Sequence, residues 1–251
     1  MCALLLLKRP LPGFRWVVAA NRDEDPQRAA TPPGLHLRRG RKILAPRDKK
    51  AGGTWIGVNE KGLGAALTNL GSSSGESPFS RGLLVFDALG CSSLAEAASQ
   101  ARARFAQFSF QPFRLLLFQG EDCLLLESHK KELLETRCQG DLLFFTHQYA
   151  PGEAEIPGLE DWRSSLGGQE VEDLIYHLQV VLATGMGHET QGHGSFPLCH
   201  LEGKHRTVSC SMIAVPDEMP HGLRFFHSNG DPLNNELLDY SVLRKRLAGV
   251  R

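Results

Sequence analysis

Short apolar segments separated by turn-forming residues are the feature of this sequence that most restricts its fold. Residues 3–7 and 15–20 flank the turn signal Pro-Leu-Pro-Gly, and residues 54–58 and 63–68 flank the turn at 59–62. Apolar runs of this length with turn signals between them are typical of β-strands joined as hairpins. Further strands are expected at residues 113–118, 123–128, 133–137, 142–146, 207–215 and 223–227.

Three other segments have the periodicity of helices. In residues 92–105, Ser93 and Glu96 have the spacing of a capping box, which marks a helix start. Residues 169–184 carry apolar side chains every three or four positions and are followed by a glycine, which commonly ends a helix. A third helix is expected at residues 234–247, near the end of the chain.

Strands in hairpins combined with a few amphipathic helices predict an α+β fold. The expected arrangement is an αββα sandwich, in which two mainly antiparallel sheets pack together and helices cover their outer faces. No repeat or linker marks a boundary, so we expect residues 1–251 to form one domain. The chain has 28 basic and 28 acidic residues, so its charge favours neither a nucleic-acid partner nor a membrane surface.

The remaining composition indicates a cytoplasmic protein. No apolar run approaches the roughly 18 residues of a transmembrane helix. The run 3–7 is shorter than the apolar core of a signal peptide, and its basic residues Lys8 and Arg9 follow it instead of preceding it. Six cysteines are scattered without a CxxC motif, so we expect reduced thiols in a cytosol-like compartment.

Cys2 is the first candidate for chemistry. Removal of Met1 would give one residue both a thiol and a free α-amino group. The α-amino group has a pKa of about 7.7–8.0, so it can accept the proton of the thiol near neutral pH. The alternative is that Cys2 is a small apolar residue at the start of a strand, as buried free cysteines often are.

Polar residues follow two of the predicted strands. In Asn21-Arg22-Asp23-Glu24, the Asp23 carboxylate could hold an ammonium group and the Asn21 amide could donate to an oxyanion. The alternative is a solvated turn. Asn69, which ends another strand, could donate to an oxyanion in the same way.

The segment Gly52-Gly53-Thr54-Trp55 is a further candidate. Paired glycines allow close approach of the backbone to another chain segment or to a ligand. Trp55 can either line a pocket or fill the core.

Taken together, these residues resemble the NRDE family, whose animal members are called transport and Golgi organisation protein 2. The motifs that carry the resemblance are Met1-Cys2, Ala19-Ala20-Asn21-Arg22-Asp23-Glu24, Gly52-Gly53-Thr54-Trp55-Ile56-Gly57 and Leu67-Thr68-Asn69. The match is dense over residues 1–70 and thins to scattered positions afterwards. It implies a fold similar to N-terminal-nucleophile hydrolases, especially the cysteine type that includes penicillin V acylase and bile salt hydrolase.

The resemblance also implies roles for single residues. In those enzymes an Asp near the second strand orients the α-amino group and Asn side chains help to bind the oxyanion. Asp23 and Asn69 match these positions, so the implied catalytic residues are Cys2, Asp23 and Asn69. A later Asn of the family pattern is replaced here by His147, and a late Arg is matched by Arg206. The implied ligand-binding residues are Asn21, Arg22, Glu24, Trp55, His147 and Arg206.

Two functions follow from this resemblance, and a third remains open. The first is hydrolysis of an amide or thioester through Cys2, with no cofactor required. The second is a carrier for haem or a similar amphipathic anion, because animal members of the family are associated with haem movement within cells. The third is an interaction protein that kept only the fold.

Two compositional clusters give weaker indications. His188, His193, His200 and His205 lie near Cys199 in a glycine-rich stretch at 185–203, but their spacing does not favour a metal site. We interpret this stretch as a loop over a cleft. The basic stretch 38–50 fits a solvated hairpin better than an anion site.

Overall fold

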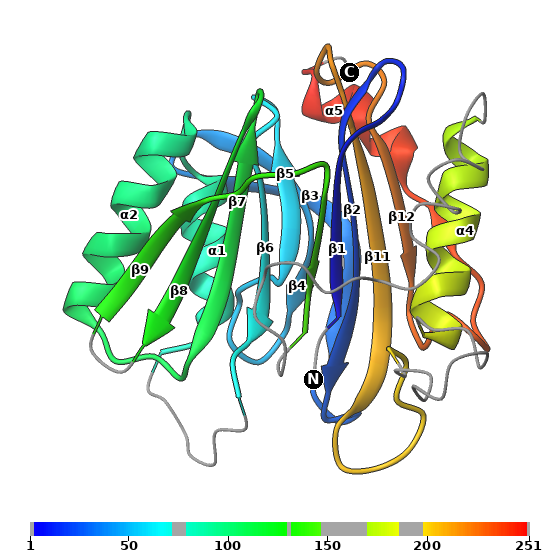
Figure 1. The fold of residues 1–251 in the computed structure, drawn as a ribbon, viewed down its shortest axis with the longest axis horizontal. Coiled ribbons are helices and arrows are strands. Elements are labelled where there is room, and N and C mark those ends of the chain that lie inside the picture. Colours follow the sequence, from blue (N-terminus) through cyan, green and yellow to red (C-terminus); the bar gives the residue numbers. More distant parts are fainter. Residues whose placement is uncertain (1–2, 72–78, 130–131, 147–169, 186–197, 250–251) are drawn as a thin grey trace.

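The apolar runs of the sequence form the strands of two antiparallel sheets (Figure 1). The computed structural model describes residues 3–71, 79–129, 132–146, 170–185 and 198–249. Sheet A has the strand order β10, β1, β2, β11, β12, β13, with bounds Leu142–Phe145, Leu4–Leu11, Phe14–Glu24, Arg206–Pro216, Arg224–Ser228 and Leu238–Asp239. Sheet B has the order β3 to β9, with bounds Ala30–Arg38, Arg41–Asp48, Ile56–Asn59, Gly64–Asn69, Phe113–Gln119, Asp122–His129 and Glu132–Arg137.

Strand β1 lies inside sheet A, between β10 and β2, as the apolar run at residues 3–7 predicts. Its partner β2 is longer than predicted. It stays paired with β11 as far as Glu24, which lies opposite Arg206. The segment 21–24 is therefore strand and not the solvated turn that we considered, and this places its side chains at the rim of the sandwich.

Helices cover both outer faces, so the predicted αββα arrangement is confirmed (Figure 1). Helices α1 (Arg81–Leu89) and α2 (Leu94–Gln107) pack on sheet B, and α4 (Val171–Thr184) packs on sheet A. A third apolar cluster, which includes Trp16 and Phe118, fills the space between the sheets. Burying one large apolar side chain stabilises a fold by about 1.5–3 kcal/mol, so these clusters account for much of the stability.

Two of the three predicted helices are confirmed. Ser93 caps α2 by accepting a hydrogen bond from the Glu96 backbone amide at 3.2 Å, and the Glu96 carboxylate accepts one from the Ser92 amide at 2.7 Å. Helix α4 ends at Gly185, whose φ of 90° is accessible mainly to glycine.

The predicted C-terminal helix at 234–247 is wrong. This segment contains β13, a 3₁₀ turn (Ser241–Leu243) and the short helix α5 (Arg244–Leu247). The Asp231 carboxylate accepts hydrogen bonds from the backbone amides of two residues that follow it, and the Tyr240 amide pairs with the Phe225 carbonyl. These bonds hold the chain against β12 and prevent a continuous helix. None of the helices in the described part of the chain is long and apolar enough to cross a membrane.

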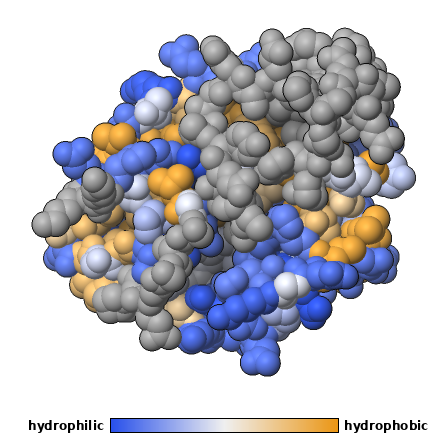
Figure 2. Space-filling model, turned by 60° about the horizontal axis from the view of Figure 1, so that its bottom comes forward, coloured by the Kyte–Doolittle hydropathy of each residue, from blue (hydrophilic) through white to orange (hydrophobic). Residues whose placement is uncertain are grey.

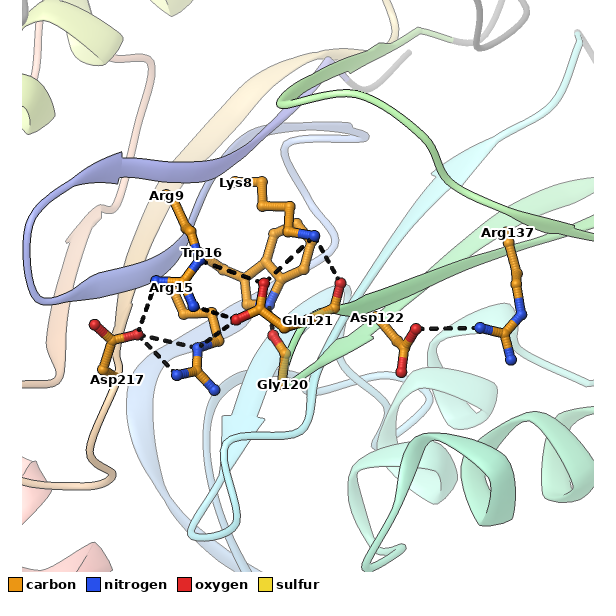
Figure 3. Close-up of polar contacts among 9 residues, drawn as sticks. All are labelled: Lys8, Arg9, Arg15, Trp16, Gly120, Glu121, Asp122, Arg137 and Asp217. Carbon is orange, nitrogen blue, oxygen red and sulfur yellow. Dashed lines mark hydrogen bonds and ion pairs between the residues drawn. The ribbon is translucent and has the colours of Figure 1, made fainter.

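A polar cluster joins the two sheets at the end of the sandwich where β1 turns into β2 (Figure 3). The Trp16 indole donates to the Gly120 carbonyl at 2.8 Å, and the Lys8 ammonium donates to the Glu121 carbonyl at 2.9 Å. The Glu121 carboxylate pairs with Arg9 and lies 3.5 Å from Arg15. The candidate site lies at the opposite end of the sandwich, where β1 begins and where this polar cluster does not reach.

Candidate functional site

A pocket of about 570 Å³ opens where the end of β2 meets the start of α1 and the end of β6. Figure 2 turns this end of the molecule forward and shows hydrophilic side chains over much of its described surface. Five of the candidate residues line the pocket, namely Arg22, Asp23, Glu24, Trp55 and Asn69. The other lining residues are Arg28, Asp48, Lys50, Ala51, Thr54, Leu67, Phe79, Ser80, Arg81, Gly82, Leu83 and Gln111.

Strand β2 directs Arg22 and Asp23 to opposite faces of sheet A, because successive side chains of a strand alternate. Both residues are nevertheless buried, with 6% and 5% of their surface exposed. The Arg22 guanidinium lies over the Trp55 ring at 4.6 Å from its centroid, a cation–π contact between the two sheets. Arg22 also lies 3.9 Å from the Glu24 carboxylate. This arrangement keeps a cation at the wall of the pocket.

The Asp23 carboxylate has partners that sequence reasoning did not identify. The Thr207 hydroxyl donates to it at 2.6 Å, and this hydroxyl in turn accepts a hydrogen bond from the His200 backbone amide at 2.9 Å. The His200 imidazole lies 3.8 Å from the other carboxylate oxygen. Burial raises the pKa of Asp23, and the Thr207 hydrogen bond and the His200 charge only partly oppose this rise. A desolvated carboxylate of this kind favours a cationic partner such as an ammonium group.

The paired glycines bring the start of α1 against the pocket. A Cβ atom at Gly53 would lie 2.3 Å from the Gly82 carbonyl carbon, so only glycine fits there. The Thr54 amide donates to the Gly82 carbonyl at 3.0 Å across this contact. The close approach expected from the sequence is thus an approach to helix α1.

Trp55 and Asn69 occupy neighbouring walls of the pocket. The Trp55 ring faces the buried imidazole of His227 at a centroid distance of 6.4 Å, and its indole N–H has no hydrogen-bond partner among the described residues. Burial lowers the pKa of His227 to about 4, so this imidazole is neutral at pH 7. It packs against the Trp55 ring as an uncharged group. Asn69 is half-buried at the end of β6, where its amide can reach a ligand.

The charges of the pocket are nearly balanced, with four cationic and three anionic side chains among the described lining residues. Arg28 pairs with Asp48, donating from Nε at 2.8 Å, and lies 3.3 Å from Glu24. Burial alone would raise the pKa of Asp48, but the Arg28 hydrogen bond and the backbone amides of Lys50 and Ala51 lower it overall. Asp48 is therefore an anion at neutral pH, and it neutralises the positive charge of Arg28 in the pocket wall.

Asn21 does not reach this pocket, so the prediction that its amide donates to an oxyanion is wrong. Alternation along β2 turns it toward α4, where its amide donates to the carbonyls of Leu182 and Leu198 at 2.9 and 2.8 Å. Both amide protons are used in these two bonds, so none is left for an oxyanion. Asn21 instead ties the C-terminal end of α4 to sheet A.

Arg206 also lies elsewhere. Its side chain is exposed and lines a second pocket of about 380 Å³, together with Asn229 and Asp231. Cys2 and His147 lie outside the described residues, as do His188 and His193 of the histidine-rich stretch. Within the described ranges no group of three or more His, Cys, Asp or Glu side chains has the geometry of a metal site.

The basic stretch at 38–50 covers the turn between β3 and β4 and all of β4, so the predicted hairpin is confirmed. It is not solvated throughout, because residues 43–46 are buried. Several of its cationic side chains form ion pairs with acidic residues. The Arg38 guanidinium donates to Asp87 at 2.8 Å, and Arg41 donates to Glu60 at 3.0 Å. Lys50 is the basic residue of this stretch that lines the pocket, beside the acidic Asp48.

Comparison with known proteins relates this geometry to a family and a fold. The family described as Transport and Golgi organisation 2 matches residues 1–149. A variant of conjugated bile acid hydrolase from Clostridium perfringens aligns over 100% of this chain and 95% of that chain, with a TM-score of 0.58 and 13% identity. A comparison with curated proteins gives no match.

Two other solved structures have the same architecture. Penicillin V acylase from Agrobacterium tumefaciens aligns over 96% of this chain and 86% of that chain, with a TM-score of 0.52 and 13% identity. The Caenorhabditis elegans ortholog of N-acylethanolamine-hydrolyzing acid amidase aligns over 94% of this chain and 100% of that chain, with a TM-score of 0.54 and 11% identity. At these identities the similarity shows the fold, which is that of N-terminal-nucleophile hydrolases.

Proposed function

The chain belongs to the Transport and Golgi organisation 2 family, and we propose that it is a hydrolase that cleaves amide or thioester bonds with Cys2 as its nucleophile. The observation that carries this proposal is the position of Asp23. The described chain begins with Ala3, whose carbonyl accepts a hydrogen bond from the Asn21 amide at 2.9 Å. Strand β1 therefore starts beside the segment of β2 that carries the buried Asp23 carboxylate, and Cys2 is bonded directly to Ala3.

In the proposed reaction, the α-amino group of Cys2 accepts the thiol proton after removal of Met1. The thiolate forms a bond to the substrate carbonyl carbon, and the carbonyl electron pair moves onto oxygen. When this intermediate collapses, the carbon–nitrogen or carbon–sulfur bond breaks and the leaving group takes the proton from the α-ammonium. Water then hydrolyses the thioester on Cys2.

Two side chains of the pocket support this reaction. Asp23 orients the α-ammonium, and Thr207 acts as a positioning residue because its hydroxyl holds one oxygen of that carboxylate. The Asn69 amide donates to the oxyanion, a contribution that is worth about 2.7–4 kcal/mol in other acyl-transfer enzymes.

The walls of the pocket favour a substrate with an apolar acyl group and a negative charge. Leu67, Phe79 and Leu83 supply apolar surface, and Arg22 and Arg81 supply positive charge. The structural neighbours are named for conjugated bile acid, penicillin V and N-acylethanolamine. These three amide classes therefore form a rational first substrate panel.

A second candidate function is binding of haem or a similar amphipathic anion, because the same cations suit propionate groups. The described lining residues include no His, Cys, Met or Tyr, the side chains that ligate haem iron. Binding within these walls would rest on charge and apolar contact. Its signature is a Soret shift that weakens in Arg22→Gln, whereas an unchanged haem spectrum at saturating protein contradicts this function.

The hydrolase proposal is tested by intact mass, thiol labelling and acyl-enzyme trapping on one preparation. We expect loss of Met1, fastest reaction of Cys2 with limiting iodoacetamide at pH 6.5, and a trapped acyl group on Cys2. Cys2→Ala removes the acyl-enzyme, whereas Cys91→Ala, which alters a buried thiol outside the pocket, keeps it. Turnover by Cys2→Ala, or an acyl group on another residue, would show that Cys2 is not the nucleophile.

A further inference from the structure

Two cysteines that are fifteen residues apart meet across a pair of neighbouring strands. The register of β8 and β9 pairs Leu124 with Arg137, and the Cys138 backbone amide donates to the Cys123 carbonyl at 2.9 Å. Cys123 and Cys138 are therefore directly opposite each other. An ion pair of 3.1 Å between Asp122 and Arg137, the residues that precede them, fastens the same end of the ladder (Figure 3).

This position is suitable for a disulfide bond. Opposed residues of antiparallel strands project to the same face, with Cα atoms about 4.5–5.5 Å apart. Disulfides are formed at Cα separations of about 4.4–6.8 Å, so the backbone does not need to move. Both side chains pack against the apolar cluster between the sheets.

The two thiols are chemically different. Cys123 has 4% of its surface exposed, whereas Cys138 is half-buried and more accessible from solvent. The interaction between the two side chains raises the pKa of Cys123 and lowers that of Cys138. The accessible member of the pair is thus the one that ionises first, which makes it the attacking thiol.

The other described cysteines lack these properties. Burial raises the pKa of Cys91 to about 11, and its thiol donates to the Asp87 carbonyl. Burial also raises the pKa of Cys210, which is fully enclosed, and that of Cys199. Among the described cysteines only Cys138 combines partial exposure with a lowered pKa.

We propose that Cys123 and Cys138 form a redox-modified pair that is oxidised to a disulfide by low-molecular-weight disulfides such as glutathione disulfide. The Cys138 thiolate attacks one sulfur of glutathione disulfide, which releases one glutathione thiolate and leaves glutathione bonded to Cys138. Cys123 then loses its proton, attacks the Cys138 sulfur and releases the second glutathione. The protein loses two electrons and two protons, and two glutathione molecules are formed.

The bond would fix the point where the chain leaves sheet B for sheet A. Cys138 follows β9, and residues 139–141 lead to β10 at the edge of sheet A. The Asp141 carbonyl accepts a hydrogen bond from the Lys8 amide at 2.7 Å. Oxidation therefore adds a covalent link at a crossover that hydrogen bonds otherwise hold. It is a modification separate from the proposed hydrolase, because neither cysteine lines the candidate pocket.

The test is to equilibrate the full chain with glutathione buffers of graded oxidation, quench in acid, alkylate the free thiols and digest with trypsin. Cleavage after Lys and Arg puts Cys123 in peptide 115–130 and Cys138 in peptide 138–163. We expect these two peptides to become linked, with the loss of two hydrogens. In Cys123→Ser, Cys138 should retain glutathione because no second thiol releases it. In Cys138→Ser, Cys123 should stay unmodified because it is buried.

Circular dichroism and the mapping of the unaltered protein keep the test decisive if a variant misfolds. Peptides 115–130 and 138–163 that remain unlinked in the most oxidising buffer would overturn the proposal. Linkage of either cysteine to a different partner, or Cys138 in Cys123→Ser that stays fully alkylated, would also overturn it. The Cys91→Ser variant is the matched control, and its Cys123–Cys138 link should form as in the unaltered protein.

Discussion

Asp23 and Asp48 are buried carboxylates of one pocket whose pKa values move in opposite directions, which makes their asparagine variants a paired test. Burial raises the pKa of Asp23 despite the Thr207 hydrogen bond. The pKa of Asp48 is lowered despite burial, because Arg28 and two backbone amides donate to it. Asparagine resembles the protonated acid in shape, so each substitution reports what the negative charge does to stability.

The expected signs follow from these shifts. A raised pKa means that the fold disfavours the Asp23 carboxylate by about 1.4 kcal/mol for each pKa unit. Asp23→Asn should therefore raise the free energy of unfolding at pH 7, and each 1 kcal/mol gained would raise Tm by roughly 2–4 °C. This gain should vanish as the pH falls below about 3.9, where the unaltered residue is protonated in both states.

Asp48→Asn should have the opposite effect. It removes a charge-assisted hydrogen bond from Arg28, so the free energy of unfolding at pH 7 should fall by about 1.5–3 kcal/mol. A lowered pKa gives stability that is present above about pH 3.9 and is lost as the pH falls through the folded-state pKa. The deficit of this variant should therefore shrink in acid.

The assay is urea unfolding of the three proteins at pH 7 and at acidic pH, with acyl-enzyme formation measured in parallel. Asp23→Asn should be more stable and less active than the unaltered protein, as expected for a charge that is kept for function. If Asp23→Asn is destabilised at pH 7 to the same degree as Asp48→Asn, the carboxylate is favourably solvated or paired in the fold. The reasoning about Asp23 would then be refuted.

Three further substitutions, one of them with a control variant, test the framework of the fold. Asn21→Ala should lower the free energy of unfolding by roughly 2–4 kcal/mol in urea, because two buried carbonyls lose their donor; a change below about 0.5 kcal/mol would contradict this. Gly53→Ala should cost about 1–3 kcal/mol through its clash with α1, whereas Gly34→Ala, where a Cβ meets only ordinary contacts at 3.8 Å, should be nearly neutral in the same measurement. Glu121→Gln should change Tm little, equivalent to at most about 1 kcal/mol, because this carboxylate is half-exposed; a larger loss that persists in high salt would be inconsistent with a surface ion pair.

The layered fold could be predicted because most strands are short apolar runs between turn signals. The structure also contains a helix, α1, that the sequence analysis missed. Its residues from Leu84 to Leu89 are all buried and form a short apolar run interrupted only by Asp87. A buried helix and a buried strand cannot be distinguished from a run this short. The prediction of a helix at residues 234–247 was wrong for a different reason. This segment has a helical pattern, but the long-range pairing of Tyr240 with Phe225 overrides it.

The candidate site was predicted in part. Polar residues at the ends of β2 and β6 and beside the paired glycines do meet in one pocket. Asn21 was misplaced because its two acceptors, the carbonyls of Leu182 and Leu198, lie 161 and 177 residues further along the chain and leave no local signal. Thr207 and His200 reach Asp23 only through the pairing of β2 with β11, which joins distant parts of the chain and leaves no local signal.

That pairing also determines the order in which the chain can fold during synthesis. In the sequence, all strands of sheet B come after the hairpin of β1 and β2 and before β11, β12 and β13, which complete sheet A beside β2. During synthesis, both apolar faces of this hairpin and the free edge of β2 remain exposed until β11 has been made. The strands of sheet B follow one another in the sequence, so they can pair as soon as they emerge from the ribosome. A chain released before β11 therefore exposes the unpaired edge of β2, and truncation ahead of Arg206 should yield aggregates instead of a smaller folded protein.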